Sequence, residues 1–336
     1  MKAGLHHGVK DGLRAASGVL ALLLVWCALL SPIVPVRAEE LIDLDIRAAM
    51  LKRKDGLITR TETVYNDIFV TKYQTLLTMT FHWKGYYFQE SQINLADPDD
   101  MPMLYGRALS VATIYPPDVK RVLVLGLGGG GLSSYLGRFL PDAVIDSVEL
   151  DPGVIDAAKK YFGMRETSRS RLIEGDGRVF LNRHSEPYDL IVVDAFTGSY
   201  IPFHLMTKEF YRLLRDRLTP HGVAAFNIIP GTKLYDSNLR TLKSVFDRID
   251  LYQSNDEAAG GRSVIVMAPR DPADAEGLKE KAVATQERYK FKFDVAKLAT
   301  DWRIELPKEI KGDELTDDFA PVNVYDAFGR RYRKKN

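Results

Sequence analysis

Cysteine is almost absent from this chain. Its 336 residues include a single one, Cys27, which lies in an apolar run near the N-terminus. If that run is removed with a leader, the remaining protein has no thiol, which excludes disulfides, thiolate catalysis and cysteine-bound zinc or iron–sulfur clusters. A strong charge of one sign is also missing, because the formal net charge is +1 at pH 7. We therefore expect no nucleic-acid partner.

Histidines are few, and they lack the spacing of metal ligands. Beyond the N-terminal region they are His82, His184, His204 and His221. A zinc site needs ligands at short, fixed intervals, and these four are scattered. We expect no bound metal. His204, which follows a candidate site loop, either contacts a substrate or has a capping or packing role.

A membrane-length hydrophobic run is lacking as well. The apolar stretch Val19–Leu30 is shorter than the ~20 residues that span a bilayer. It follows a basic start and precedes Val36–Ala38, which is the layout of a secretory signal peptide. We predict that residues 1–38 are a cleaved leader, with an uncleaved anchor as the alternative. In both cases the folded part should lie outside, as a periplasmic or extracellular protein or as a membrane-anchored one.

The pattern divides the rest of the chain into two parts and a tail. Residues 39–100 predict an exposed lead-in over 39–60, with a short helix, followed by a small antiparallel β domain. Gly85 marks a hairpin turn in that domain. Residues 101–329 predict the main domain, and the basic tail at 330–336 predicts a solvated end.

Apolar strand segments alternate with helical segments in the main domain. The strand segments are 122–125, 144–148, 171–173, 190–193 and 223–226. Continuous apolar runs suit buried parallel strands, and this alternation gives a sheet with helices on both faces. The predicted fold class is therefore α/β, with a methyltransferase-like (Rossmann-like), mostly parallel sheet.

A glycine-rich segment, Gly126–Gly131, directly follows the first strand and directly precedes a helix. Glycines such as Gly126 and Gly128 let the backbone turn tightly and approach a ligand closely. Glu149 ends the next strand, where a carboxylate can accept both hydroxyls of a ribose. This combination predicts a nucleoside site, of either the dinucleotide or the S-adenosylmethionine kind.

Acids also follow the third and fourth strands. Asp176 precedes Gly177, and Asp194 follows the run Leu190–Val193. Together with Glu149 they place acids at three successive strand ends, which suits a cationic ligand and suits a pyrophosphate badly. The alternatives are a turn residue for Asp176 and a helix cap for Asp194.

These residues, with several other stretches, resemble the spermidine synthase-like polyamine aminopropyltransferases, in particular a divergent branch of that family. The matching stretches are 65–70, 94–99, 105–109, 122–131, 148–154, 175–177, 194–196, 201–205, 209–211 and 317–321. The family transfers an aminopropyl group from decarboxylated S-adenosylmethionine to an amine such as putrescine and releases methylthioadenosine. The resemblance implies that donor, or S-adenosylmethionine itself, together with a small-molecule amine.

The resemblance also assigns roles to residues. Asp194 would take the proton of the attacking amine, since a protonated amine has no lone pair. Glu149 would recognise the ribose, and Asp176 with Gly177 the adenine. Gln89 would be the donor-binding glutamine, with Gln92 as the alternative. Tyr105 would belong to the amine pocket.

Three departures from the family pattern affect the amine. Gly129 stands where the glycine loop usually has an aspartate that holds the donor's amine. Thr197 stands where a second aspartate usually holds the acceptor. Gly106 and Arg107 replace a histidine and a glutamate. The loss of two acids and the gain of Arg107 predict weaker affinity for a diamine, with Thr197 in the altered acceptor pocket.

Two other functions stay open. An S-adenosylmethionine-dependent methyltransferase could use the same fold, and a non-catalytic homologue could keep the nucleoside site without turnover. An exported domain favours the second of these, because adenosyl donors are made in the cytoplasm. A homodimer and membrane association through the N-terminus are further expectations.

Overall fold

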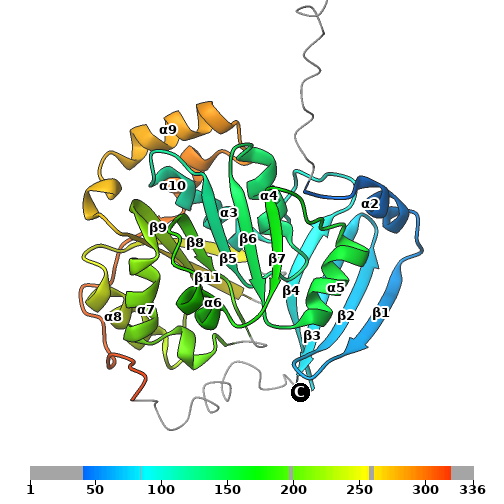
Figure 1. Cartoon of the computed structure of the whole chain (residues 1–336), viewed down its shortest axis with the longest axis horizontal. Coiled ribbons are helices and arrows are strands. Elements are labelled where there is room, and N and C mark those ends of the chain that lie inside the picture. The colour runs from blue at the N-terminus through cyan, green and yellow to red at the C-terminus, as the bar shows by residue number, and fades with distance from the viewer. Residues whose placement is uncertain (1–40, 84, 197–199, 257–260, 319–336) are drawn as a thin grey trace, which may run out of the picture. The chain divides into compact units, whose positions relative to one another are not determined.

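The computed structural model describes residues 41–83, 85–196, 200–256 and 261–318 (Figure 1). The predicted leader at 1–38, the tail at 330–336 and Thr197 lie outside these residues. Within them, no helix is both long enough and apolar enough to cross a membrane.

A four-stranded antiparallel sheet forms the N-terminal part, in the order β1-β2-β3-β4. The strands are β1 (Gly56–Glu62), β2 (Asp67–Tyr73), β3 (Leu76–Trp83) and β4 (Tyr86–Asn94). Gly85 has a φ of 82°, a left-handed conformation that glycine adopts without strain, and it lies in the β3–β4 turn. The small antiparallel sheet is as predicted.

An eight-stranded sheet forms the main part, in the order β12-β10-β11-β9-β8-β5-β6-β7. The strands are β5 (Arg121–Leu125), β6 (Val144–Glu149), β7 (Ser170–Glu174), β8 (Tyr188–Val193), β9 (Leu218–Ile228), β10 (Asp250–Asp256), β11 (Gly261–Pro269) and β12 (Arg303–Ile304). The five strands from β5 to β9 are parallel, as predicted. The last three pair antiparallel at one edge, and the sequence patterns did not predict them.

Helices cover both faces of this sheet, because alternate residues of its strands face opposite sides. Val122 and Val124 belong to the core on one face, and Leu123 and Leu125 to the core on the other. The first face is covered by α3 (Leu104–Ser110), α4 (Gly131–Phe139), α9 (Leu278–Tyr289) and α10 (Val295–Asp301). The second is covered by α6 (Gly177–Arg183), α7 (Lys208–Asp216) and α8 (Tyr235–Val245), as Figure 1 shows.

The small sheet packs against α5 (Pro152–Ala157) and the π-helical turn that follows it, Ala158–Phe162. Val154, Ala157 and Phe162 share an apolar cluster with the inward side chains of β2, β3 and β4. In Figure 1, α5 lies in front of these strands. This packing holds β4 beside the glycine loop that follows β5.

The lead-in is mostly exposed and holds a short helix, as predicted, but its beginning is buried. Leu41 and Ile42 are buried, and Leu41 joins the core beside α4. The helix α2 (Leu44–Leu51) follows, and its Arg47 donates a hydrogen bond to the carbonyl of Phe162. β1 also begins inside the predicted lead-in. The contacts that bury this segment come from residues far along the chain, which local patterns do not reveal.

Candidate active site

A cavity of ≈ 700 Å³ lies at the carboxyl ends of β5, β6, β8 and β9, and residues of β4 line it as well. β5 lies between β6 and β8, so the chain proceeds from β5 to one side of the sheet and returns to the other. Ligands bind at such switch points in open α/β sheets. The predicted site residues that are described lie around this cavity.

The glycine loop passes close to two neighbouring segments. Gly126 has a φ of 98°, and a Cβ there would lie 2.2 Å from the carbonyl oxygen of Asp194. Gly128 has a φ of 52°, and its Cβ would lie 3.1 Å from the Cβ of Ser91 on β4. Only glycine fits such conformations at such distances. The loop is therefore held between the end of β8 and β4, with its backbone on the cavity wall.

Glu149, at the end of β6, holds the glycine loop by its carboxylate. Its Oε2 accepts a hydrogen bond from the Leu127 amide at 2.9 Å, and its Oε1 accepts one from the Asp151 amide at 3.0 Å. Burial raises the pKa of Glu149, and these backbone N–H groups oppose that rise. Each oxygen keeps a further lone pair, so the group can also accept from a ligand hydroxyl.

Asp176 has two roles in the structure. Its Oδ1 accepts from the Val179 amide at 2.9 Å, so it is the N-cap of α6, a local role that differs from the turn residue named as its alternative. Its Oδ2 lies 2.7 Å from Nε2 of His204, and this bond lowers the pKa of Asp176. Both side chains and Gly177 line the cavity. His204 therefore joins the site through Asp176.

Asp194 follows β8 and faces the cavity. It is not the N-cap of any helix in the described residues, and its Oδ1 accepts from Nδ2 of Asn227 at 2.8 Å. Burial raises the pKa of Asp194 to about 6, although hydrogen bonds from Asn227 and Tyr105 pull it the other way. The carboxylate is thus mostly ionised at neutral pH and a better proton acceptor than an exposed aspartate.

Of the two candidate glutamines, Gln89 lines the cavity and Gln92 does not. Gln92 donates from its Nε2 to the hydroxyl of Thr78 on the neighbouring strand β3, at 2.9 Å. Tyr105, on α3, also lines the cavity, and its hydroxyl, which has one proton to donate to either Asp194 or the backbone carbonyl of Glu90, lies 3.2 Å from that carbonyl. Of the two glutamines, Gln89 is therefore the one at the cavity, and Tyr105 lies beside Asp194.

Two residues of the site were missed by sequence reasoning, Glu90 on β4 and Asn227 on β9. Both line the cavity, and each has a buried oxygen, Glu90 Oε1 and Asn227 Oδ1, with no hydrogen-bond partner among the described residues. Burial, with the nearby charges of Asp194 and Glu149, raises the pKa of Glu90 well above its usual range. The sequence offered one signal for Glu90, because this acid directly follows the candidate site residue Gln89.

Acidic side chains determine the charge of the cavity. Those that line it are Glu90, Glu149, Asp151, Asp176 and Asp194. Among the described lining residues there is no lysine or arginine, and the histidine, His204, is already bonded to Asp176. A field of one sign in an enclosed site concentrates ligands of the opposite sign. The cavity can therefore bind a cation and would repel an anion.

The space beside Gly129 is filled by Phe162. A Cβ at Gly129 would lie 2.4 Å from the Phe162 ring, and that ring is fully buried under the small sheet. Gly129 is not among the residues that line the cavity. The glycine loop therefore offers neither an acid nor room for one at this position.

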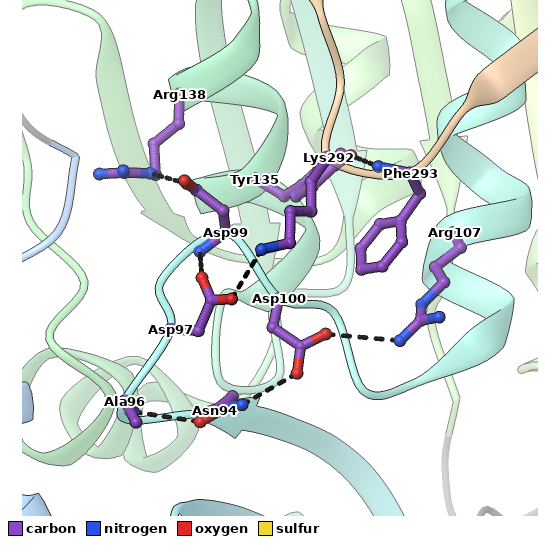
Figure 2. A network of polar contacts seen from close by, with 10 residues as sticks. All are labelled: Asn94, Ala96, Asp97, Asp99, Asp100, Arg107, Tyr135, Arg138, Lys292 and Phe293. Carbon is purple, nitrogen blue, oxygen red and sulfur yellow. Dashed lines mark hydrogen bonds and ion pairs between the residues drawn. The ribbon is translucent and has the colours of Figure 1, made fainter.

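Arg107 does not line the cavity, and its side chain belongs to a network outside it (Figure 2). Its Nε donates to the Met101 carbonyl at 2.7 Å, and its guanidinium pairs with Asp100 and lies 3.9 Å from the centre of the Phe293 ring. In the same network Asp99 pairs with Arg138, from α4. These contacts fix the loop between β4 and α3.

Comparisons with known proteins agree with this architecture. A family model described as the spermine/spermidine synthase domain matches residues 107–254. A polyamine aminopropyltransferase of Vibrio vulnificus is 31% identical over 275 residues, which cover 80% of this chain and 91% of that protein. One of Chromobacterium violaceum is 32% identical over 210 residues, which cover 61% and 78%.

A solved structure, the spermidine synthase from Thermotoga maritima, has the same fold. Its TM-score is 0.58 at 20% identity, and the match covers 75% of this chain and 84% of that one. This likeness confirms the predicted methyltransferase-like α/β class with its small N-terminal sheet.

Proposed function

Because this chain belongs to the polyamine aminopropyltransferase family, a family of transferases, we propose that it moves an aminopropyl group from decarboxylated S-adenosylmethionine to an amine. The observation that carries this proposal is the charge of the cavity, whose described lining includes five acids and neither lysine nor arginine. Donor and acceptor are both cations, so both suit this field.

Each half of the donor has a matching part of the cavity wall. The ribose would lie at Glu149 and the adenine at Asp176 and Gly177, with the backbone of Gly126 and Gly128 alongside. Gln89 would contact the donor from the small sheet. These positions follow the carboxyl ends of β5, β6 and β7, where nucleosides bind in sheets of this kind.

The transfer step needs a base and a fixed alignment. The ammonium of the acceptor gives a proton to Asp194, and its freed lone pair attacks the carbon next to sulfur. A C–N bond forms as the C–S bond breaks, and the bonding electrons go to sulfur, which leaves as neutral methylthioadenosine. A pKa of about 6 suits Asp194 to this role, because the base is ionised at neutral pH.

The same charge argues against the undecarboxylated donor. Intact S-adenosylmethionine carries a carboxylate on the arm that would enter the acidic part of the cavity, and no cationic side chain among the described lining residues could pair with it. Every ~1.4 kcal/mol of unfavourable interaction free energy weakens binding tenfold. We therefore favour aminopropyl transfer over methyl transfer.

The test is release of methylthioadenosine by the full chain, measured with a panel of amines that includes putrescine. We expect release with the decarboxylated donor and an amine, and none without the amine. Methylation of an acceptor by the intact donor would instead support a methyltransferase. Nucleoside binding without turnover of either donor would support a non-catalytic homologue.

A further inference from the structure

Glu90 lies at an irregular point of β4. Met79 pairs with Ser91, and the next residue, Thr80, pairs with Gln89, so Glu90 is the extra residue of a β-bulge. In a regular strand successive side chains point to opposite faces, yet Gln89, Glu90 and Ser91 all line the cavity. Bulges redirect side chains in this way next to active sites.

The backbone at the bulge is held over the glycine loop. The hydroxyl of Tyr105 lies 3.2 Å from the Glu90 carbonyl, within hydrogen-bond distance. The same carbonyl would lie 3.7 Å from a Cβ at Gly128. The side chain of Glu90 therefore starts from a fixed position beside the loop that follows β5.

The carboxyl group of Glu90 lacks a hydrogen-bond partner for one of its oxygens among the described residues. Its Oε1 is buried with no hydrogen-bond partner among the described residues, and the charges of Asp194 and Glu149 both act on it. A buried carboxylate without a partner is costly, and such groups are normally paired. The described lining has no lysine or arginine that could serve. A cationic ligand in the cavity would supply such a partner.

We propose that Glu90 binds the ammonium group of the donor's aminopropyl arm and so selects the decarboxylated donor. This inference rests on the proposed function. The donor is the ligand concerned because Glu90 is close to both Glu149, at the ribose, and Asp194, at the attacking amine, and the arm must extend between these two. The glycine loop supplies no acid itself, since Phe162 fills the space beside Gly129.

The test compares Glu90→Gln with the parent protein in calorimetry with three nucleosides. Methylthioadenosine lacks the arm, the decarboxylated donor carries its ammonium, and intact S-adenosylmethionine carries ammonium and carboxylate. Loss of a charge-assisted hydrogen bond should weaken the decarboxylated donor about ten- to a hundredfold. Methylthioadenosine should change less than about threefold, and the intact donor should bind equally well or more tightly, because a repulsive charge is gone.

A matched control is Glu174→Gln, the same chemical change on an exposed residue at the end of β7 that does not line the cavity. Glu90→Met, which keeps the volume without a polar end, should reproduce the loss. An unchanged affinity for the decarboxylated donor, or an equal loss for all three nucleosides, would overturn the role of Glu90. A parent that binds none of the three would instead refute the proposed function and this inference with it.

Discussion

The part of the cavity that we propose for the nucleoside (the nucleoside half, with Glu149 and Asp176) and the part that we propose for the amines (the amine half, with Glu90, Asp194 and Asn227) differ in how their polar groups are satisfied. In the nucleoside half, both oxygens of Glu149 and both of Asp176 have hydrogen-bond partners within the protein. In the amine half, Glu90 and Asn227 each keep a buried oxygen without a partner among the described residues. Burial raises the pKa values of acids in both halves, Glu149 in the first and Glu90 and Asp194 in the second, but the backbone N–H groups that bond to Glu149 oppose the rise there.

This difference indicates two ways of building a binding site. The nucleoside half is preorganised, so a ligand adds contacts to groups that are already in place. The amine half carries a desolvation cost in the empty protein, which a cation would relieve. Binding there should be more sensitive to charge than to shape. The following predictions test the two halves separately.

The largest effect should come from Asp194→Asn, which removes the base of the amine half. Asparagine keeps the shape and can still bond to Asn227, but it cannot take a proton. The rate of methylthioadenosine release should fall about 10²–10⁴-fold. Calorimetry should show nearly unchanged affinity for methylthioadenosine. A variant as fast as the parent would show that Asp194 is structural.

Glu149→Gln should have the converse effect, because it belongs to the nucleoside half. Glutamine loses one of the two acceptor oxygens and the charge that strengthens their bonds. We expect methylthioadenosine to bind about ten- to a hundredfold more weakly. The loss should be similar for the decarboxylated donor, since both share the ribose. Equal affinity of variant and parent for methylthioadenosine would reject the ribose role.

Gly129→Asp tests whether the glycine loop has room for an acid at this position. The new Cβ would overlap the buried ring of Phe162. Overpacking of this kind typically costs about 1–3 kcal/mol of unfolding free energy. Gly129→Ala, which adds only the Cβ, separates this steric cost from the charge and should cost a similar amount.

The same substitution in a Phe162→Leu background completes a double-mutant cycle measured by denaturant unfolding. Leucine is smaller than phenylalanine and has no ring, so Gly129→Asp should lower the unfolding free energy by less in this background. An identical cost in both backgrounds would show that Phe162 is not the obstacle.

Asp194→Asn should also change stability, in a pH-dependent way. Burial raises the pKa of Asp194 from 3.8 to about 6. The folded state is therefore favoured while this carboxyl is protonated, and that contribution is lost as pH rises from the unfolded pKa through the folded one. The neutral asparagine avoids the loss. It should stabilise the protein by about 1–3 kcal/mol near pH 8 and by little near pH 4. Denaturant titrations at both pH values measure this, and an equal effect at both would contradict the assignment.

The parallel centre of the fold could be predicted from the sequence because it is locally encoded. Continuous apolar runs such as Val122–Leu125 and Leu190–Val193 indicate buried parallel strands. The glycines or the acid that follow each run mark the carboxyl end of the strand, which is the edge of the sheet where the site lies. The antiparallel strand β10 has no such pattern, since Leu251-Tyr252 is followed by polar residues. Its place is determined by pairing with β11, which sequence periodicity does not show.

Site residues were predictable where a side chain's direction follows from its position at a strand end, as for Glu149 and Asp194. Glu90 was missed because a β-bulge breaks the alternation from which direction is inferred. The direction of the Arg107 side chain could not be inferred from its position either. Its place in the sequence is next to the amine pocket, but its side chain turns to Asp100 and Phe293 instead.

Arg107→Gln should therefore have the smallest effect of these changes, although it too alters a charge near the amine half. The Asp100 pair is half-buried and long, at 3.4 Å, and the contact with Phe293 is a cation–π interaction. With the hydrogen bond from Arg107 Nε to the Met101 carbonyl at 2.7 Å, they should be worth about 1–3 kcal/mol of unfolding free energy, so the small effect is expected on catalysis. Because Arg107 does not line the cavity, the KM for the amine should change less than about twofold. A much lower KM for the amine in this variant would mean that the guanidinium charge reaches the cavity. The different effects of Arg107→Gln and Glu90→Gln would then follow from the change in net charge and not from where each side chain lies.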